Sequence, residues 1–80
     1  MSSTVEERTR KVVAEVLGLP IDAVTRQTSH KEVDNWDSLN VLNILMAIEA
    51  EFEVSVNPEE AASFVSVDQI LSVLSSKGIA

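Results

Sequence analysis

The chain contains no cysteine, which excludes a disulfide framework, a thiolate nucleophile and a zinc site of the cysteine type. Glycine and proline are scarce, with two residues of each. Because 45% of the 80 residues are hydrophobic, the chain has enough apolar surface to order itself. We therefore expect a single domain over residues 1–80, too small for a catalytic cleft that is enclosed on all sides.

Long hydrophobic runs are also absent. The longest, residues 44–48, is far shorter than the roughly 20 residues that span a bilayer. Residues 1–5 do not show the basic start of a secretory signal. We expect a cytoplasmic protein with no membrane span, present as a monomer.

Basic residues are missing from most of the second half of the chain. The net charge is −7, and residues 1–31 hold five bases and four acids, whereas residues 32–76 hold nine acids and no base. Such a segment repels nucleic acid and anionic lipid and attracts a basic protein surface. We expect no nucleic-acid partner, although an acidic face can also serve only to keep a small protein in solution.

The first helix is predicted over residues 4–17. Ser3 and Glu6 have the spacing of a capping box, and apolar residues recur on one helical face as far as Leu17. Gly18 then ends the pattern. A long connection follows up to residue 36, with a short turn expected at residues 21–24.

The second helix is predicted over residues 38–53 and carries two apolar stripes. The narrow stripe consists of Leu39, Leu42 and Met46. The wider stripe consists of Val41, Ile44, Leu45, Ile48 and Phe52. The thin face left to point outward consists of Asn40, Asn43, Ala47, Ala50 and Glu51. We expect this helix to be central and packed over most of its circumference.

Two further helices complete the pattern. Residues 57–60, N-P-E-E, combine a cap, a proline at the first helical position and acids in the first turn, so a short third helix should carry residues 61–64. Ser66 and Gln69 repeat the capping-box spacing and begin the last helix. The predicted fold class is all-α: a small four-helix bundle with three longer helices and one short third helix.

Ser38 stands out as the candidate functional residue. Asp37 is the natural N-cap of the second helix, so Ser38 would occupy the first helical position with its hydroxyl exposed at the positive end of the helix dipole. Backbone N–H groups of the first turn would stabilise a phosphate attached there. Aspartate and serine also favour helix starts without any function, so the dipeptide alone does not decide between the two interpretations.

The motif W-D-S-L-N at residues 36–40 heads the second of four helices, follows a long loop and precedes an acidic stretch. In this arrangement the sequence resembles the acyl carrier protein family along essentially the whole chain. The resemblance implies that Ser38 carries 4'-phosphopantetheine, transferred from coenzyme A by a phosphopantetheinyl transferase. The thiol of this group would hold an acyl or aminoacyl cargo as a thioester. Asp37 would cap the helix beside the attachment site, and Leu39 would contact modifying and partner enzymes.

The same resemblance implies a carrier with no catalytic residue and no bound metal. Its partners would be the transferase, a ligase that loads the cargo, and downstream transferase or synthase enzymes. Because the chain has no cysteine, the only thiol would be that of the prosthetic group.

The sequence departs from carriers of bacterial fatty acid synthesis at Asn40 and Asn43, where those carriers usually have acidic residues. A basic docking patch would lose electrostatic steering, so we expect a dedicated pathway instead of housekeeping fatty acid synthesis. The W-D-S-L motif also resembles stand-alone carriers of secondary metabolism and aminoacyl carriers. The candidate docking residues are Trp36, Asn40, Asn43, Met46, Glu59 and Glu60. Further acids available for docking are Glu49, Glu51 and Glu53.

Trp36 is the second departure, because a small residue is common at its place. It is either a hydrophobic staple that packs onto the first turns of the second helix or a partner contact beside Ser38. We favour the staple.

Other interpretations of these residues fit less well. A catalytic triad of Ser38 with His30 and Asp34 or Asp37 lacks a G-x-S-x-G turn. A calcium loop at residues 34–37 would place Trp36 at a ligand position and lacks the turn glycine. The remaining alternative to a carrier is an unmodified acidic helical module that binds a basic partner. The two differ in whether Ser38 accepts phosphopantetheine.

Overall fold

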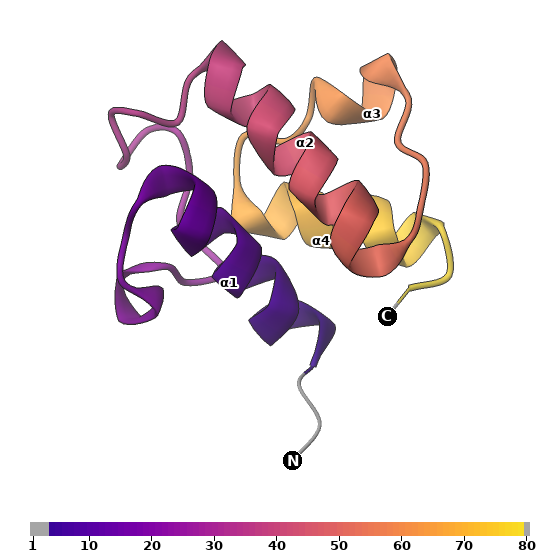
Figure 1. Ribbon diagram of the computed structural model, residues 1–80, viewed down its shortest axis with the longest axis horizontal. Coiled ribbons are helices and arrows are strands. Elements are labelled where there is room, and N and C mark those ends of the chain that lie inside the picture. The colour runs from indigo at the N-terminus through magenta and orange to yellow at the C-terminus, as the bar shows by residue number, and fades with distance from the viewer. Residues whose placement is uncertain (1–3, 80) are drawn as a thin grey trace.

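The computed structural model describes residues 4–79. Its elements are α1 (Val5–Leu17), the 3₁₀ helix η1 (Ile21–Ala23), α2 (Ser38–Phe52), α3 (Pro58–Ala61) and α4 (Val67–Ser76). Figure 1 shows the three longer helices and the short α3, so the predicted all-α, four-helix class is confirmed. No helix of the described part of the chain combines the length and the apolar character that a bilayer span needs.

The start of α1 differs by one residue from the prediction. Thr4 is the N-cap, and its hydroxyl accepts a hydrogen bond from the N–H of Glu7 at 3.0 Å. Thr4 and Glu7 repeat the predicted capping spacing one position later, so the helix begins at Val5, and Ser3 lies outside the described residues. Gly18 ends the helix as predicted, at φ 70°, in the left-handed region that favours glycine.

The later helices also begin at capped residues. Asp37 caps α2, Ser66 caps α4, and Asn57 and Glu60 exchange both hydrogen bonds of a capping box at α3. The third helix is shorter than predicted, because it ends at Ala61. Beyond it, the N–H of Phe64 bonds to the carbonyl of Ala61 at 3.0 Å, which is the spacing of a turn and not of an α-helix.

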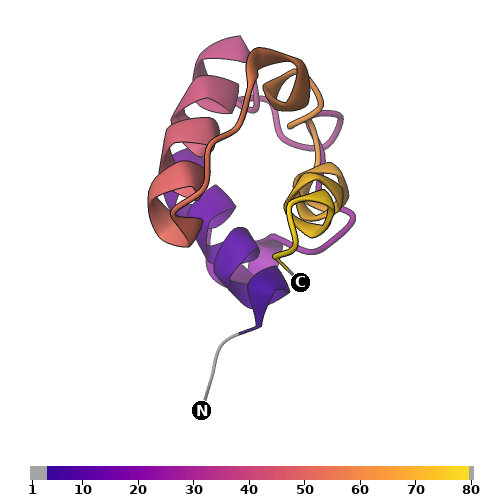
Figure 2. The same cartoon turned by 90° about the vertical axis from the view of Figure 1, so that its right-hand side faces the viewer.

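The core lies between α1, α2 and α4. α1 packs against both other long helices, and Figure 2 shows α2 facing α3 and α4 across the interior. The fully buried residues of this core include Val13, Ile44, Ile48, Phe64, Ile70 and Leu74. One apolar face of each long helix therefore supplies the same core, but α2 is not packed over most of its circumference as predicted.

The outward face of α2 is not the one predicted. Leu39, Leu42 and Met46 are 67%, 54% and 59% exposed, whereas Asn40 and Asn43 are half-buried. Because α1 contacts one flank of α2 and α3 another, positions spaced by three and four residues along the remaining side point to solvent. The prediction that the asparagines form the outward face is wrong, and an apolar stripe takes their place.

The long connection between α1 and α2 is tied to the rest of the molecule. It contains η1, as predicted, and its residue Val24 is fully buried. The N–H of His30 bonds to the carbonyl of Val65 at 2.9 Å, and the N–H of Val67 bonds to the carbonyl of Thr28 at 3.0 Å. These bonds attach the connection to the segment between α3 and α4 and so fix its exit toward Ser38.

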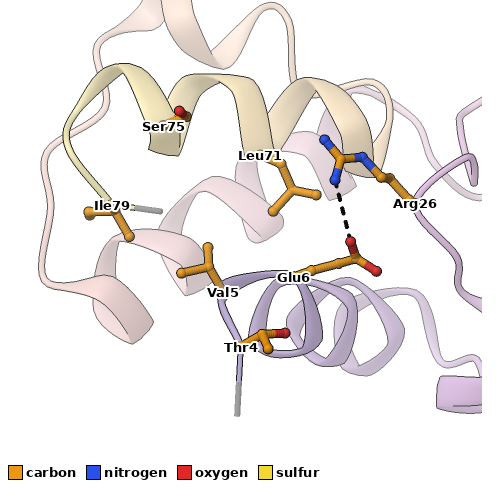
Figure 3. A pocket seen from close by; sticks show the side chains of 7 residues that line it. All are labelled: Thr4, Val5, Glu6, Arg26, Leu71, Ser75 and Ile79. Atoms are coloured by element: carbon orange, nitrogen blue, oxygen red, sulfur yellow. Dashed lines mark hydrogen bonds and ion pairs between the residues drawn. The ribbon is translucent and has the colours of Figure 1, made fainter.

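A hollow of about 300 Å³ lies between the start of α1 and the end of α4. Figure 3 shows Val5, Leu71 and Ile79 on its apolar side and the ion pair between Arg26 and Glu6 across it. The shortest N–O distance in that pair is 3.4 Å, and Arg26 also bonds to Asp68 of α4 at 2.8 Å. Arg26 thus links the connection to both helices.

Candidate functional site

Ser38 is the first residue of α2 and is exposed. The carboxylate of Asp37 accepts the N–H of Asn40 at 3.0 Å, and the carbonyl of Asp37 accepts the N–H of Val41 at 2.8 Å. The N–H groups of Ser38 and Leu39 precede the first intrahelical donor, so they have no acceptor within the helix. The site therefore presents a hydroxyl next to two outward backbone donors.

Three asparagines hold the start of α2 in place. The side-chain amide of Asn35 donates to the carbonyl of Leu17 at 2.9 Å, and that of Asn40 donates to the carbonyl of Asn35 at 2.6 Å. The side-chain amide of Asn43 extends this series of hydrogen bonds by donating to the side-chain oxygen of Asn40 at 3.1 Å. Asn40 and Asn43, predicted to face a partner, bond within the protein. The role of Asn35 was not predicted, because the carbonyl that accepts its hydrogen bond lies at the end of another helix.

Trp36 enters the core directly before the cap. Its side chain is only 4% exposed, and the indole N–H donates to the carbonyl of Phe64 at 3.0 Å. Trp36 and Val41 are the positions before the cap and four residues into the helix, and both line one hollow. This orientation agrees with a hydrophobic staple. Because the Trp36 side chain leaves almost no surface for a partner, the prediction of Trp36 as a docking residue is wrong.

Two hollows adjoin the start of α2. The first has a volume of about 340 Å³ and is lined by His30, Trp36, Asp37, Ser38, Val41, Ala62 and Val65. The second lies between α2 and α3, has a volume of about 310 Å³ and is lined by Val41, Leu42, Leu45, Val56, Pro58, Ala61 and Ala62. Val41 and Ala62 line both, so the two hollows are neighbours. The hollow of Figure 3 shares no residue with either.

A family model described as the phosphopantetheine attachment site matches residues 7–74 of the chain. The chain belongs to this family. Its members attach 4'-phosphopantetheine covalently to a serine, and its domains are non-catalytic carriers. The resemblance to the acyl carrier proteins found in the sequence is therefore confirmed.

The residues at the start of α2 fit a phosphopantetheine group. A phosphodiester on an exposed hydroxyl at this position would meet the N–H groups of Ser38 and Leu39, which have no acceptor within the helix. The carboxylate of Asp37 is already engaged by Asn40. When bound, the group supplies a thiol on a long flexible arm that holds the cargo as a thioester.

The acidic residues of the carrier divide into engaged and exposed ones. Glu49 accepts the N–H of Val56 at 2.9 Å, and Glu51 pairs with Arg8 at 2.7 Å. Glu60 pairs with Lys77 at 2.8 Å, and this contact lowers the pKa of the Glu60 carboxyl. The acids Glu49, Glu51 and Glu60, predicted to be available to partners, are thus bonded within the fold.

Two predicted docking acids differ from this group. Glu53 and Glu59 are exposed, and no ion pair or side-chain hydrogen bond of either carboxylate occurs within residues 4–79. The exposed stripe Leu39, Leu42 and Met46 begins directly after Ser38. No charged residue occurs between positions 38 and 48. The helical surface that follows Ser38 is therefore apolar, and Glu53 and Glu59 lie farther along the chain.

Proposed function

We propose that the protein is an acyl or aminoacyl carrier that bears 4'-phosphopantetheine on Ser38 and has no catalytic activity of its own. The observation that carries this proposal is the exposed hydroxyl at the first position of α2 in a chain of the phosphopantetheine attachment site family. Other serines use their side chains inside the fold: Ser29, Ser63, Ser66 and Ser76 all hydrogen-bond to neighbouring residues. Within residues 4–79, Ser38 is the serine that combines an exposed hydroxyl with a helix start.

The chain's own residues hold this hydroxyl in a fixed place. Asp37 caps α2. The hydrogen bonds of Asn35, Asn40 and Asn43 join the first two turns of α2 to the end of α1. Trp36 anchors the preceding backbone in the core. A rigid attachment point suits a carrier, because the prosthetic arm is then the only flexible part between the folded domain and the cargo.

We further propose that partner enzymes dock on the exposed stripe of Leu39, Leu42 and Met46. These partners are the phosphopantetheinyl transferase, a loading ligase and downstream transferase or synthase enzymes. Because the stripe has no charge, docking there should depend weakly on salt. Glu59 is exposed and is available to a basic residue of the partner. Such a surface suits enzymes of a dedicated pathway better than enzymes with strongly basic docking patches.

The groove between α2 and α3 offers a place for the apolar part of a cargo. Its lining is almost entirely aliphatic and includes Leu42, Leu45 and Val56. Each methylene group of an acyl chain that leaves water there would gain about 0.8 kcal/mol. An acyl cargo would then be partly shielded during transport.

Intact mass spectrometry tests the attachment. The apo protein is incubated with coenzyme A and a broad-specificity phosphopantetheinyl transferase, beside a Ser38→Ala variant whose fold is checked by circular dichroism. We expect a mass gain of one phosphopantetheine in the native protein and none in the variant. No gain with an active transferase, and with the cognate one as well, would favour the unmodified interaction module.

A further inference from the structure

The hollow beside Ser38 has a polar side and an apolar side. His30 and Asp37 contribute polar groups, while Val41, Ala62 and Val65 contribute aliphatic ones. Ser38 lines the same hollow, whose volume is about 340 Å³. A group attached to the Ser38 hydroxyl therefore starts next to a space that offers both a hydrogen-bonding ring and an apolar surface.

His30 is held at this hollow by two contacts with one carbonyl. Its backbone N–H donates to the oxygen of Val65 at 2.9 Å, and its ring Nδ1 lies 3.2 Å from the same oxygen. Because a carbonyl oxygen only accepts hydrogen bonds, the proton of this contact belongs to Nδ1. The other ring nitrogen, Nε2, is then an acceptor in the neutral ring and a donor in the protonated ring.

We propose that His30 is a positioning residue for the prosthetic group and donates a hydrogen bond through Nε2 to the phosphodiester on Ser38. The branched, apolar segment that follows the phosphate in the arm then lies against Val41, Ala62 and Val65. The inference rests on the proposed attachment at Ser38. It gives the only histidine of the chain a role.

His30 is the residue lining the hollow that can offer a cationic donor to a phosphodiester. A phosphodiester is negative and accepts a charge-assisted hydrogen bond from protonated histidine. Asp37 is the one carboxylate that lines the hollow, and it already accepts the N–H of Asn40. Neither α2 after Asp37 nor the α3–α4 segment contributes a charged lining residue.

Charged neighbours of His30 on its own connection are Lys31, Glu32 and Asp34. The Glu32 carboxylate turns back to the N–H and hydroxyl of Ser29, at 2.8 and 2.7 Å. These hydrogen bonds hold the pKa of Glu32 below its ordinary value, so it stays ionised across the neutral range.

The experiment is a ³¹P NMR titration of the loaded protein from pH 5 to 8. A phosphodiester has no second ionisable proton, so its signal moves in this range only if a neighbouring group titrates. Histidine titrates in this range in the absence of strong perturbation. We expect a single inflection in the native protein, its loss in His30→Gln, and its retention in the control Lys31→Gln, which changes an adjacent charge but keeps the ring.

A flat ³¹P curve in the loaded native protein would overturn the proposal, and so would an inflection that persists in His30→Gln. The native titration decides the matter even where the variant folds poorly. Loading of Ser38 is measured first by intact mass in every sample. Failure to load would contradict the carrier function, whereas loading without the histidine-dependent inflection would contradict the role of His30 alone.

Discussion

Two apolar stripes of α2 have the same chemistry and opposite surroundings. Ile44 and Ile48 are fully buried, whereas Leu42 and Met46 are more than half exposed. A buried aliphatic side chain stabilises the fold, while an exposed one retains apolar surface that a second protein can cover. One helix therefore divides its hydrophobic residues between the core and an exposed stripe, which is the docking surface that we propose.

Two adjacent glutamates repeat this contrast with charge. Glu60 pairs with Lys77 of the C-terminal segment, whereas Glu59 is exposed. Both residues lie in the first turn of α3. They differ in their partners because their side chains lie on different sides of this helix. Substitutions matched across these pairs separate stability from recognition.

The largest expected effect separates the two stripes of α2. Ile44→Ala should lower the free energy of unfolding by about 2–5 kcal/mol, because it leaves a cavity in the core. Met46→Ala should change it by no more than about 0.5 kcal/mol, because the side chain is largely in solvent. Urea denaturation of both variants measures the difference. Equal losses would contradict the division of α2 into a folding and a docking side.

The indole N–H of Trp36 gives the next effect. Trp36→Phe keeps an aromatic ring but leaves the buried carbonyl of Phe64 without its donor. We expect a loss of about 1–3 kcal/mol in the free energy of unfolding. Thermal or urea unfolding measures it, and an unchanged stability would mean that Trp36 contributes by packing alone.

Docking on the exposed stripe should be weakened without a loss of stability. Met46→Gln is expected to lower kcat/KM of the phosphopantetheinyl transferase for the apo protein by threefold to tenfold, or roughly 0.7–1.4 kcal/mol. Ile21→Gln is the matched control, because Ile21 is also an exposed apolar residue but belongs to η1. Equal effects of the two variants, or a steep dependence on salt for the native protein, would count against docking on this stripe.

The smallest expected effect concerns the two glutamates. Lys77 lowers the pKa of Glu60 in the folded state, so this pair adds stability above the ordinary pKa of glutamate and loses it as pH falls through the lowered value. Glu60→Gln should therefore lose less stability between pH 7 and 3 than the native protein, and Glu59→Gln should follow the native curve. The effect is small because the pair is near the surface. Identical curves of stability against pH for all three proteins would contradict a stabilising role of the pair between Glu60 and Lys77.

Local signals in the sequence predicted most of the fold. Asp37, Gly18 and Asn57 act on residues within three or four positions, so their patterns predict where helices begin and end. The W-D-S-L-N motif likewise placed Ser38 at the first position of α2, as the structure shows.

Features that depend on distant segments were not predicted. Both stripes of α2 are apolar, so periodicity alone does not tell which one faces α1 and which one faces solvent. The pairing of Glu60 with Lys77 and the bond from Trp36 to Phe64 join residues 17 and 28 positions apart. The place of His30 beside Ser38 likewise depends on its bonds to Val65 across the fold.

Fragmentation mass spectrometry of the loaded protein identifies the residue that carries the added group. We predict that the whole of the added mass resides on Ser38. The exposed serines Ser55, Ser72 and Ser75 serve as internal controls that should remain unmodified. Phosphopantetheine on any of these three, or none on Ser38 after treatment with an active cognate transferase, would contradict the account of Ser38 as the tether of a carrier protein.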